Sequence, residues 1–194
     1  MSSAVVADTW IFATQNPHKL AEARQILHGI ICLQPLPPQL PAAPEPHDTL
    51  YENALAKARF YAEMGFGPLI VEDSGLFVPA LGGEPGVHSA HYGGPQRLLS
   101  ALRGISQRRA YFAAIVLAYE GSHTYRFFTG VWWGQIAHEA AGKEGFGYDP
   151  IFIPEGTSHT VAQLGASYKV LHSHRSQAFQ KLAIWLSQRR HTGA

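Results

Sequence analysis

Two long segments rich in β-branched and aromatic residues constrain the fold of this chain most. They cover Arg109–Tyr119 and Thr124–Trp133, and the turn Glu120-Gly121-Ser122 joins them. Strand-forming segments separated by a short turn that contains glycine predict an antiparallel hairpin. The sheet is therefore expected to be mixed and not purely parallel.

Strands and helices alternate before this hairpin. Trp10–Thr14 is predicted to be a short buried strand, and Asn16-Pro17 is typical of an N-cap followed by proline in the first helical turn. Three apolar residues at helical spacing support this helix: Leu20, Ala23 and Leu27. Gly29 is expected to end it, and Ile30–Gln34 is expected to form a second strand.

The next segment is dense in proline. Gln34–Pro46 contains six prolines, which are incompatible with a helix or a central strand, so an extended loop is expected. Thr49 and Glu52 then fit a capping box for a helix that runs to about Met64. Leu69–Val71 is predicted to be a buried strand that ends at two carboxylates.

Turn and cap signals predict the remaining elements. A glycine-rich connection over Leu81–Gly94 leads into a short helix over Pro95–Leu102. Lys143–Pro150 is a turn-rich loop, and Ser173 is the expected N-cap of a last helix that ends near Arg189. Alternating strands and helices followed by a hairpin predict an α/β fold with a mixed sheet. Because no composition break divides the 194 residues, a single domain is expected.

Composition excludes several classes of protein. The formal net charge is +1 and no basic run occurs, so a nucleic-acid partner is not expected. The apolar stretch Tyr111–Tyr119 is too short to span a membrane, and residues 1–8 lack the features of a secretory signal. The single cysteine, Cys32, favours a reducing, cytoplasmic location. Its neighbours Ile31 and Leu33 predict a buried, inert thiol.

The first candidate for chemistry is the strand-to-helix turn Thr14–Lys19. Free backbone N–H groups and the positive dipole end at a helix start favour a phosphate. Thr14 and Asn16 add hydrogen-bonding side chains, and Lys19 adds a charge. An ordinary capped helix with a solvated lysine is the simpler alternative for this segment alone. No P-loop pattern occurs anywhere in the chain.

The second candidate is the pair Glu72-Asp73, followed by Ser74-Gly75. Burying two carboxylates without a partner is costly, so a cation or another partner is expected beside them. Oxygen ligands suit Mg²⁺, which binds one or two carboxylates together with substrate phosphates. Strand neighbours point to opposite faces, so the two acids need not share a role. A polar strand end with an Asp-Ser-Gly turn is the structural alternative. Glu52 is assigned to the helix cap.

Two further segments suit a base or an anion. In Gly145–Pro150, two glycines allow close approach of a ligand, Phe146 and Tyr148 offer rings for stacking, and Asp149 can accept hydrogen bonds from a base. A turn with buried aromatic residues is the alternative. Lys169 with Ser173-His174-Arg175 places cationic donors at the start of the last helix. Together the four segments predict a metal–nucleotide site.

The same segments also resemble a known family. In order along the chain they are Thr14-Gln15-Asn16-x-x-Lys19, Tyr51-Glu52-Asn53-Ala54-x-x-Lys57-Ala58, Glu72-Asp73-Ser74-Gly75, Leu81-Gly82-Gly83-x-Pro85-Gly86, Gly145-Phe146-Gly147-Tyr148-Asp149-Pro150 and Ser173-His174-Arg175. This ordered set is similar to the inosine/xanthosine triphosphate pyrophosphatase family. It covers nearly the whole chain. Each motif alone is weak, and the ordered set is specific.

The resemblance implies an activity and an assembly. It implies Mg²⁺-dependent hydrolysis of ITP, dITP and XTP between the α- and β-phosphates, which gives the monophosphate and pyrophosphate. It also implies a homodimer of two-lobed subunits, each on a long mixed β-sheet flanked by helices. A pyrophosphatase of another modified nucleotide and a non-catalytic nucleotide-binding regulator remain alternatives.

The resemblance also implies roles for individual residues. Asp73 is implied to hold metal and activate water, with Glu45 as an upstream metal ligand and Glu72 as a further candidate ligand. The implied substrate-binding residues are Thr14, Gln15, Asn16, Lys19, Lys57, Ser74, Phe146, Gly147, Tyr148, Asp149, Lys169, His174 and Arg175. The stretch Pro44–Asp48 departs from the family pattern, so Asp48 remains the alternative to Glu45. The segment between Tyr92 and Tyr111 is short for the family.

Overall fold

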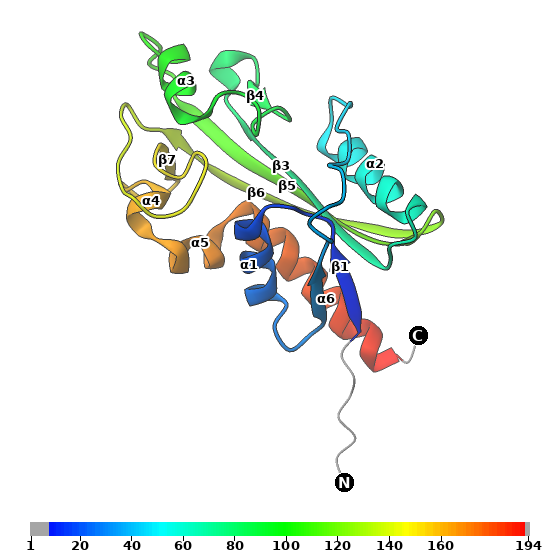
Figure 1. Ribbon diagram of the computed structural model, residues 1–194. Helices are drawn as coiled ribbons and strands as arrows, with labels where there is room; N and C mark the ends of the chain where they lie inside the picture. Colours follow the sequence, from blue (N-terminus) through cyan, green and yellow to red (C-terminus); the bar gives the residue numbers. More distant parts are fainter. Residues whose placement is uncertain (1–7, 193–194) are drawn as a thin grey trace.

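The strands of residues 8–192, the part of the chain that the computed structural model describes, form one seven-stranded mixed sheet (Figure 1). They are β1 (Thr9–Phe12), β2 (Cys32–Pro35), β3 (Leu69–Phe77), β4 (Pro85–Gly86), β5 (Arg109–Gly121), β6 (Thr124–Ile136) and β7 (Phe152–Pro154). The strand order is β2-β1-β3-β5-β6-β7, and β4 pairs with β3. β1 runs parallel to β2 and β3, and the other pairs are antiparallel.

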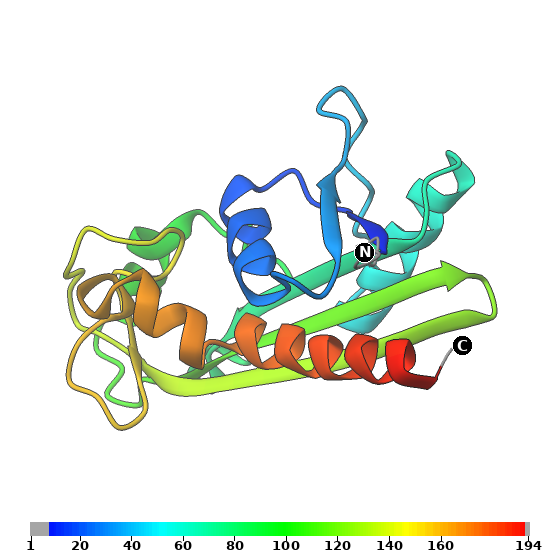
Figure 2. The same ribbon diagram turned by 90° about the horizontal axis from the view of Figure 1, so that it is seen from below.

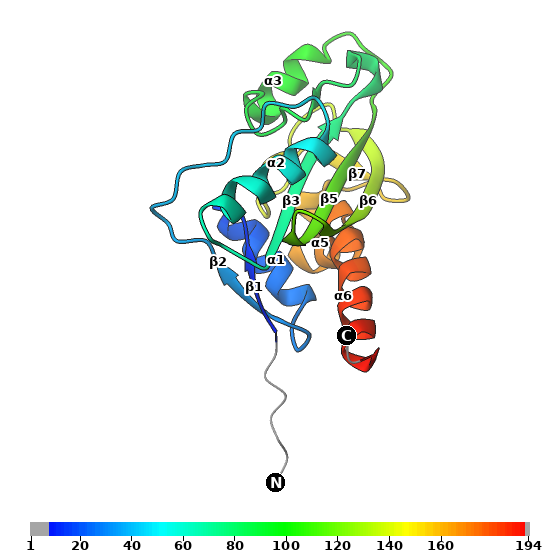
Figure 3. The ribbon, with the colours of Figure 1, turned by 90° about the vertical axis from the view of Figure 1, so that its right-hand side faces the viewer.

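Helices cover both faces of this sheet. They are α1 (Pro17–Ile26), α2 (Leu50–Glu63), the 3-10 helix η1 (Pro79–Leu81), α3 (Gly94–Ala101), α4 (Val161–Leu164), α5 (Ala166–His172) and α6 (His174–Thr192). Figure 3 shows α2 on one side of the strands and α6 on the other. Figure 2 shows α6 running along the long hairpin of β5 and β6. The second lobe lies at one end of the long strands β5 and β6 and contains α3, β4, β7 and α4 (Figure 1).

The alternation of side chains along β3 divides the core. Ile70 packs with Phe12 and Phe179 in the layer that α1 and α6 cover. Leu69 and Val71 pack on the opposite face, in the layer that α2 covers. Because strand neighbours point to opposite faces, Glu72 continues the α6 side and Asp73 continues the α2 side.

Several sequence predictions are confirmed. β5 and β6 form the predicted hairpin, and the sheet is mixed. The Asn16 side chain caps α1, and Pro17 is the first helical residue, as predicted. The end of α1 differs slightly from the prediction: the helix ends at Ile26, three residues before Gly29. The Thr49 side chain caps α2, and its hydroxyl donates to Glu52 Oε2 (2.7 Å), which supports the structural reading of Glu52.

Two predictions are wrong. Glu72 and Asp73 do not end their strand: β3 continues to Phe77, because it pairs with β5 over its whole length and this pairing overrides the turn signal of Asp-Ser-Gly. Cys32 is exposed, not buried. It lies on the edge strand β2, where alternation turns Leu33 inward and Cys32 outward. The predicted absence of a secretory signal concerns residues 1–8, of which residues 1–7 lie outside the described residues.

One edge of β3 is only partly paired. On that edge β1 pairs with Leu69 and Ile70, and β4 pairs with Leu76 and Phe77. Residues Val71–Gly75 have no strand partner there among the described residues; we call this stretch the open edge of β3.

None of the helices in residues 8–192 has the length and apolar character needed to cross a bilayer.

Candidate active site

A cavity of about 320 Å³ opens beside Ser74 and Gly75 of the open edge. Its lining residues come from α1, β3, β5, the loop before α3, the loop after β6, α5 and α6: Asn16, Lys19, Ser74, Gly75, Ser89, Ala90, Gly94, Phe112, Phe146, Gly147, Tyr148, Asp149, Lys169, His174 and Arg175. Gly75 is required by close packing, because a Cβ there would collide with the carbonyl oxygen of Gly86. Ten of the predicted site residues therefore line one cavity.

Only some side chains of the Thr14–Lys19 turn line this cavity. Asn16 Oδ1 accepts from the backbone N–H groups of His18 (2.9 Å) and Lys19 (3.3 Å), and Thr14 Oγ1 accepts from Asn16 N (3.1 Å). Gln15 instead donates to the Leu40 carbonyl in the proline-rich loop (2.7 Å). Thr14 and Gln15 thus shape the turn, and Asn16 and Lys19 line the cavity.

Glu72 forms ion pairs with two cations that line the cavity, Lys19 and Arg175. Its Oε2 lies 2.7 Å from Lys19 Nζ, and its Oε1 lies 3.2 Å from Arg175 Nη2. Burial by itself would raise the pKa of Glu72, but Arg175 and Lys19 outweigh it and hold the pKa well below the usual range. Glu72 is therefore a buried, charged anchor for Lys19 and Arg175, on the face opposite Asp73.

A further carboxylate, which the sequence analysis did not select, completes this cluster. Glu22 on α1 lies 3.3 Å from Lys169 Nζ and 2.7 Å from Arg175 Nη1. Lys169 also pairs with Asp149 Oδ2 (2.7 Å). The signal was present in the sequence: Glu22 follows Lys19 by three residues, so both lie on one side of α1.

The charges of this cluster balance. Three cations (Lys19, Lys169 and Arg175) meet three carboxylates (Glu22, Glu72 and Asp149). The sequence suggested a local excess of positive charge for an anionic ligand, but the paired geometry leaves little such excess here. A polyanionic ligand beside this cluster would need another source of positive charge.

Asp73, Lys57 and Glu45 gather on the opposite face of β3. Lys57 on α2 forms an ion pair with Glu45 in the proline-rich loop. Burial would lower the pKa of Lys57, but the carboxylates of Glu45 and Asp73 outweigh it and raise the pKa. Burial raises the pKa of Asp73 to about 6, and Glu45 and Glu72 add to this against the opposing charge of Lys57. Asp48, the alternative to Glu45, is exposed.

The environment of Asp73 fits a divalent cation. Its Oδ1 accepts from Ser74 N (3.1 Å), whereas its buried Oδ2 has no hydrogen-bond partner among the described residues. A buried, unpartnered carboxylate oxygen near a second carboxylate is a ligand set that Mg²⁺ accepts, because this ion keeps waters and substrate phosphates as its other ligands. No group of three or more His, Cys, Asp or Glu side chains suited to a metal occurs within residues 8–192.

Aromatic side chains and His174, whose Nδ1 atom has no hydrogen-bond partner among the described residues, line another part of the cavity. The Tyr148 hydroxyl donates to the Ser89 carbonyl (2.8 Å), and burial raises its pKa to about 12. His174 stacks on Phe112 with 4.7 Å between ring centroids, and its buried Nδ1 has no partner among the described residues. Burial lowers the pKa of His174 well below its usual value, and the charge of Arg175 lowers it further. His174 therefore faces the cavity as a neutral imidazole.

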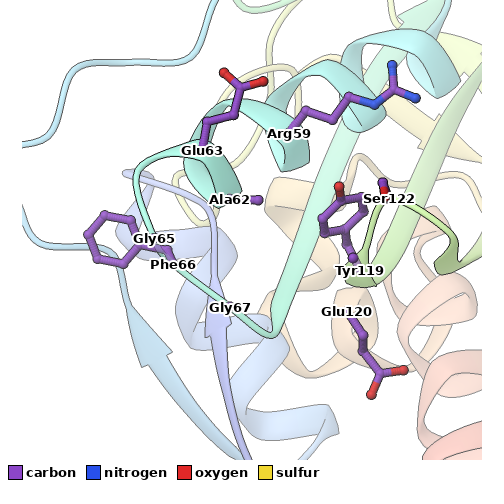
Figure 4. A pocket seen from close by; sticks show the side chains of 10 residues that line it. Arg59, Ala62, Glu63, Gly65, Phe66, Gly67, Tyr119, Glu120 and Ser122 are labelled. Atoms are coloured by element: carbon purple, nitrogen blue, oxygen red, sulfur yellow. The ribbon is translucent and has the colours of Figure 1, made fainter.

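A larger cavity of about 730 Å³ lies at the other end of the sheet (Figure 4). It is lined by the end of α2, the loop after α2 and the tip of the hairpin, with Arg59, Glu63, Phe66 and Tyr119 among its residues. Figure 4 shows Phe66 pointing away from Tyr119, so these side chains do not converge on one ligand. None of the predicted site residues lines this cavity. The smaller cavity is the functional candidate, because buried ion pairs and unpartnered polar atoms occur beside it.

Comparisons with known proteins identify similar sequences. The sequence pattern of the Ham1 family matches residues 10–185. A protein of Porphyromonas gingivalis named dITP/XTP pyrophosphatase is 42% identical over 193 residues, which cover 91% of this chain and 96% of the relative. A protein of Methanopyrus kandleri with the same name is 43% identical over 180 residues, which cover 90% and 94%.

Solved structures show the same fold. A HAM1 protein from Coxiella burnetii superimposes with a TM-score of 0.86 at 36% identity, covering 93% of this chain and 99% of that one. The Ham1 protein of Staphylococcus aureus superimposes with a TM-score of 0.83 at 32% identity, covering 94% and 100%. Both similarities extend over nearly the full length of each chain.

Proposed function

The chain belongs to the Ham1 family, and from that premise we propose that it hydrolyses the deaminated purine nucleotides ITP, dITP and XTP to the monophosphate and pyrophosphate. The activity would remove these nucleotides from the nucleotide pool. A reducing, cytoplasmic location, expected from the single cysteine, is part of this proposal.

One observation carries the proposal. Beside the open edge of β3, an acidic group, Asp73 with Glu45, lies on one face of the sheet, and a ring-lined cavity that includes His174 lies on the other. The cavity volume of about 320 Å³ suits a small ligand. A nucleotide has the matching polarity, with a flat base at one end and a polyanion at the other.

We assign the acid–base role to Asp73. Its buried Oδ2 has no hydrogen-bond partner among the described residues, so this oxygen can accept the proton of the attacking water. The water then attacks the α–β phosphoanhydride, and the monophosphate and pyrophosphate separate.

Asp73 and Glu45 are the residues proposed to hold Mg²⁺. The ion would supply the positive charge that a triphosphate needs beside the neutral ion-pair cluster, and it would acidify bound water. Lys57 pairs with Glu45 in the structure. If Glu45 held the metal, Lys57 would be free to contact phosphate oxygens, which is the role proposed for it together with Lys19 and the Thr14–Asn16 turn.

The proposal is tested directly by identifying the two products of ITP hydrolysis. With ITP and Mg²⁺ the chain should release IMP and pyrophosphate in equal amounts, because the proposed cleavage lies between the α- and β-phosphates. EDTA should abolish the release. The measurement is chromatography of the nucleotide together with separate assays of pyrophosphate and orthophosphate. IDP and orthophosphate as the primary products would overturn the proposal.

We also propose a homodimer, with the outer face of β6 as its surface. Alternation along β6 buries Trp132, which is 7% exposed, and turns Trp133 outward, which is 38% exposed. Tyr125 and Val131 on the same side of the strand are exposed as well, and Tyr51 of α2 lies next to them through Phe127. We call these five residues (Tyr51, Tyr125, Phe127, Val131 and Trp133) the β6 apolar face, because exposed apolar side chains on one side of a strand are found at protein interfaces.

Val131→Glu should therefore convert the dimer into a monomer, because a charge would be buried in the interface without a partner. Light scattering after size exclusion at micromolar concentration measures the mass. Ile184→Glu is the matched control: Ile184 is an exposed apolar residue on α6, 59% exposed, and this variant should remain a dimer. A wild-type chain that is monomeric at this concentration would contradict the proposal.

A further inference from the structure

His18 lies in the Thr14–Lys19 turn, between Asn16 and Lys19, and none of the roles proposed above involves it. It is exposed on the first turn of α1. Its ring stacks on the ring of Phe146, with 4.9 Å between centroids and an interplanar angle of 16°. The two residues are far apart in the sequence, so this contact connects the start of α1 to the loop around Phe146, which lines the cavity.

The loop around Phe146 needs such a contact. Gly145 (φ 79°) and Gly147 (φ 61°) flank Phe146, and glycines leave the backbone free to adopt many other conformations. Two sets of contacts hold the loop. Phe146 N donates to Asp149 Oδ2 (2.9 Å) and Asp149 N donates to the Phe146 carbonyl (3.3 Å), whereas Lys169 Nζ and Arg175 Cζ lie 3.8 Å and 5.8 Å from the centroid of the Phe146 ring. The first set fixes the backbone, and the second places positive charge over the ring.

The His18 ring adds what these contacts lack. A point charge over an aromatic ring permits the ring to rotate beneath it, whereas a parallel ring fixes the plane as well as the position. Phe146 lines the cavity, and His18 does not. His18 therefore supports the Phe146 ring from outside the cavity.

We propose that His18 is a positioning residue for base binding: its ring stacks on Phe146 and sets the plane on which the purine of the substrate packs. This deepens the proposed function and rests on it for the identity of the base. The proposal assigns the effect to the ring of His18 and not to its charge or hydrogen bonds, since no side-chain hydrogen bond of His18 supports the loop.

Three variants separate these possibilities. His18→Ala removes the ring, His18→Phe keeps an aromatic ring without nitrogen, and His28→Ala is the control. His28 is also exposed and lies just beyond the other end of α1. Each variant should fold, because both histidines are exposed.

The first measurement needs no substrate. Hydrogen exchange of the ligand-free protein is followed by mass spectrometry over a peptide that contains residues 144–149. In His18→Ala the amide of Phe146 should exchange faster than in the wild type, because the loop loses a support. His18→Phe should restore the wild-type rate, and His28→Ala should leave it unchanged. An unchanged rate in His18→Ala, or a rate in His18→Phe as fast as in His18→Ala, would overturn the proposal.

The second measurement is steady-state kinetics with ITP. A single ring-stacking contact corresponds to about a three- to tenfold change in binding. His18→Ala should raise KM by that factor and leave kcat within about twofold, since the ring of His18 contacts Phe146 of the proposed base-binding loop. His18→Phe should restore KM. An equal fall of kcat in His18→Ala, or an unchanged KM, would count against the proposal. A wild-type chain without activity on ITP would refute the proposed function, and the exchange measurement would still decide whether His18 holds the loop.

Discussion

Asp73→Asn should lower kcat on ITP by about 10²-fold or more, the usual scale for the loss of a general base. The amide cannot take a proton from water, and it is a poor ligand for Mg²⁺ compared with a carboxylate. The structure supports this assignment through the burial of Asp73 and through its unpartnered Oδ2. Initial rates of pyrophosphate release at saturating ITP and Mg²⁺ measure the effect.

Glu72→Gln is the informative comparison for this prediction. Glu72 neutralises Lys19 and Arg175 in a buried cluster, so its replacement leaves cations without a partner and should lower the free energy of unfolding by about 3 kcal/mol or more. Urea unfolding should therefore separate the two variants, with Asp73→Asn close to the wild type. Asp48→Asn, at an exposed carboxylate, should change neither property. Near-wild-type activity in Asp73→Asn, with loss only in Glu72→Gln, would transfer the role to Glu72.

The ratio of kcat/KM for ITP to that for ATP should be about 10⁴ or higher, the scale that a site built for one hydrogen-bonding pattern can reach. Hypoxanthine and xanthine carry a 6-keto group, and adenine carries a 6-amino group. The unpartnered Nδ1 of His174 can donate to the keto oxygen when it holds the proton of the neutral ring. Opposite the amino group of adenine that donor would stay unpaired, which is costly in a buried site.

His174→Phe tests this prediction, because phenylalanine keeps the stack on Phe112 but cannot donate. The variant should lose most of its kcat/KM for ITP, so that the ratio falls toward 1. In the wild type the ratio should stay constant between pH 6.5 and 8, because burial keeps the pKa of His174 well below this range and the ring is neutral throughout. Equal use of ATP and ITP by the wild type would refute the assignment. Arg175 is a less direct probe, since its guanidinium already binds Glu22 and Glu72.

Local signals in the sequence predicted most elements. Asn16-Pro17 and Thr49 predicted where α1 and α2 begin, and the composition of residues 109–133 predicted the hairpin. These features depend on groups a few residues apart, so the sequence contains all the partners. The short elements β4, β7, α4 and α5 were not predicted. β4 and β7 form by pairing with other strands. α4 and α5 are too short to show a helical periodicity, although Thr160 and Gln163 form a capping box for α4.

For the site, the sequence determined the chemical groups. It selected the carboxylates of Glu72 and Asp73, several cations and the aromatic loop. The order of the motifs predicted the family, and only that resemblance added Glu45. Residue type and spacing are sufficient for this, because they limit which ligands a segment can bind.

Only the tertiary structure decided what each group does. The pairing of β3 with β5 carries the strand past Asp73, and alternation then turns Glu72 toward Lys19 and Arg175 and Asp73 toward Lys57. The partial pairing of its other edge opens the sheet there. Glu22 and His18 acquire partners only when α1 packs beside α6 and the loop of Phe146. The physical reason is distance: Coulomb energies, burial and ring stacking act over a few ångströms in space, and separation along the sequence does not encode them.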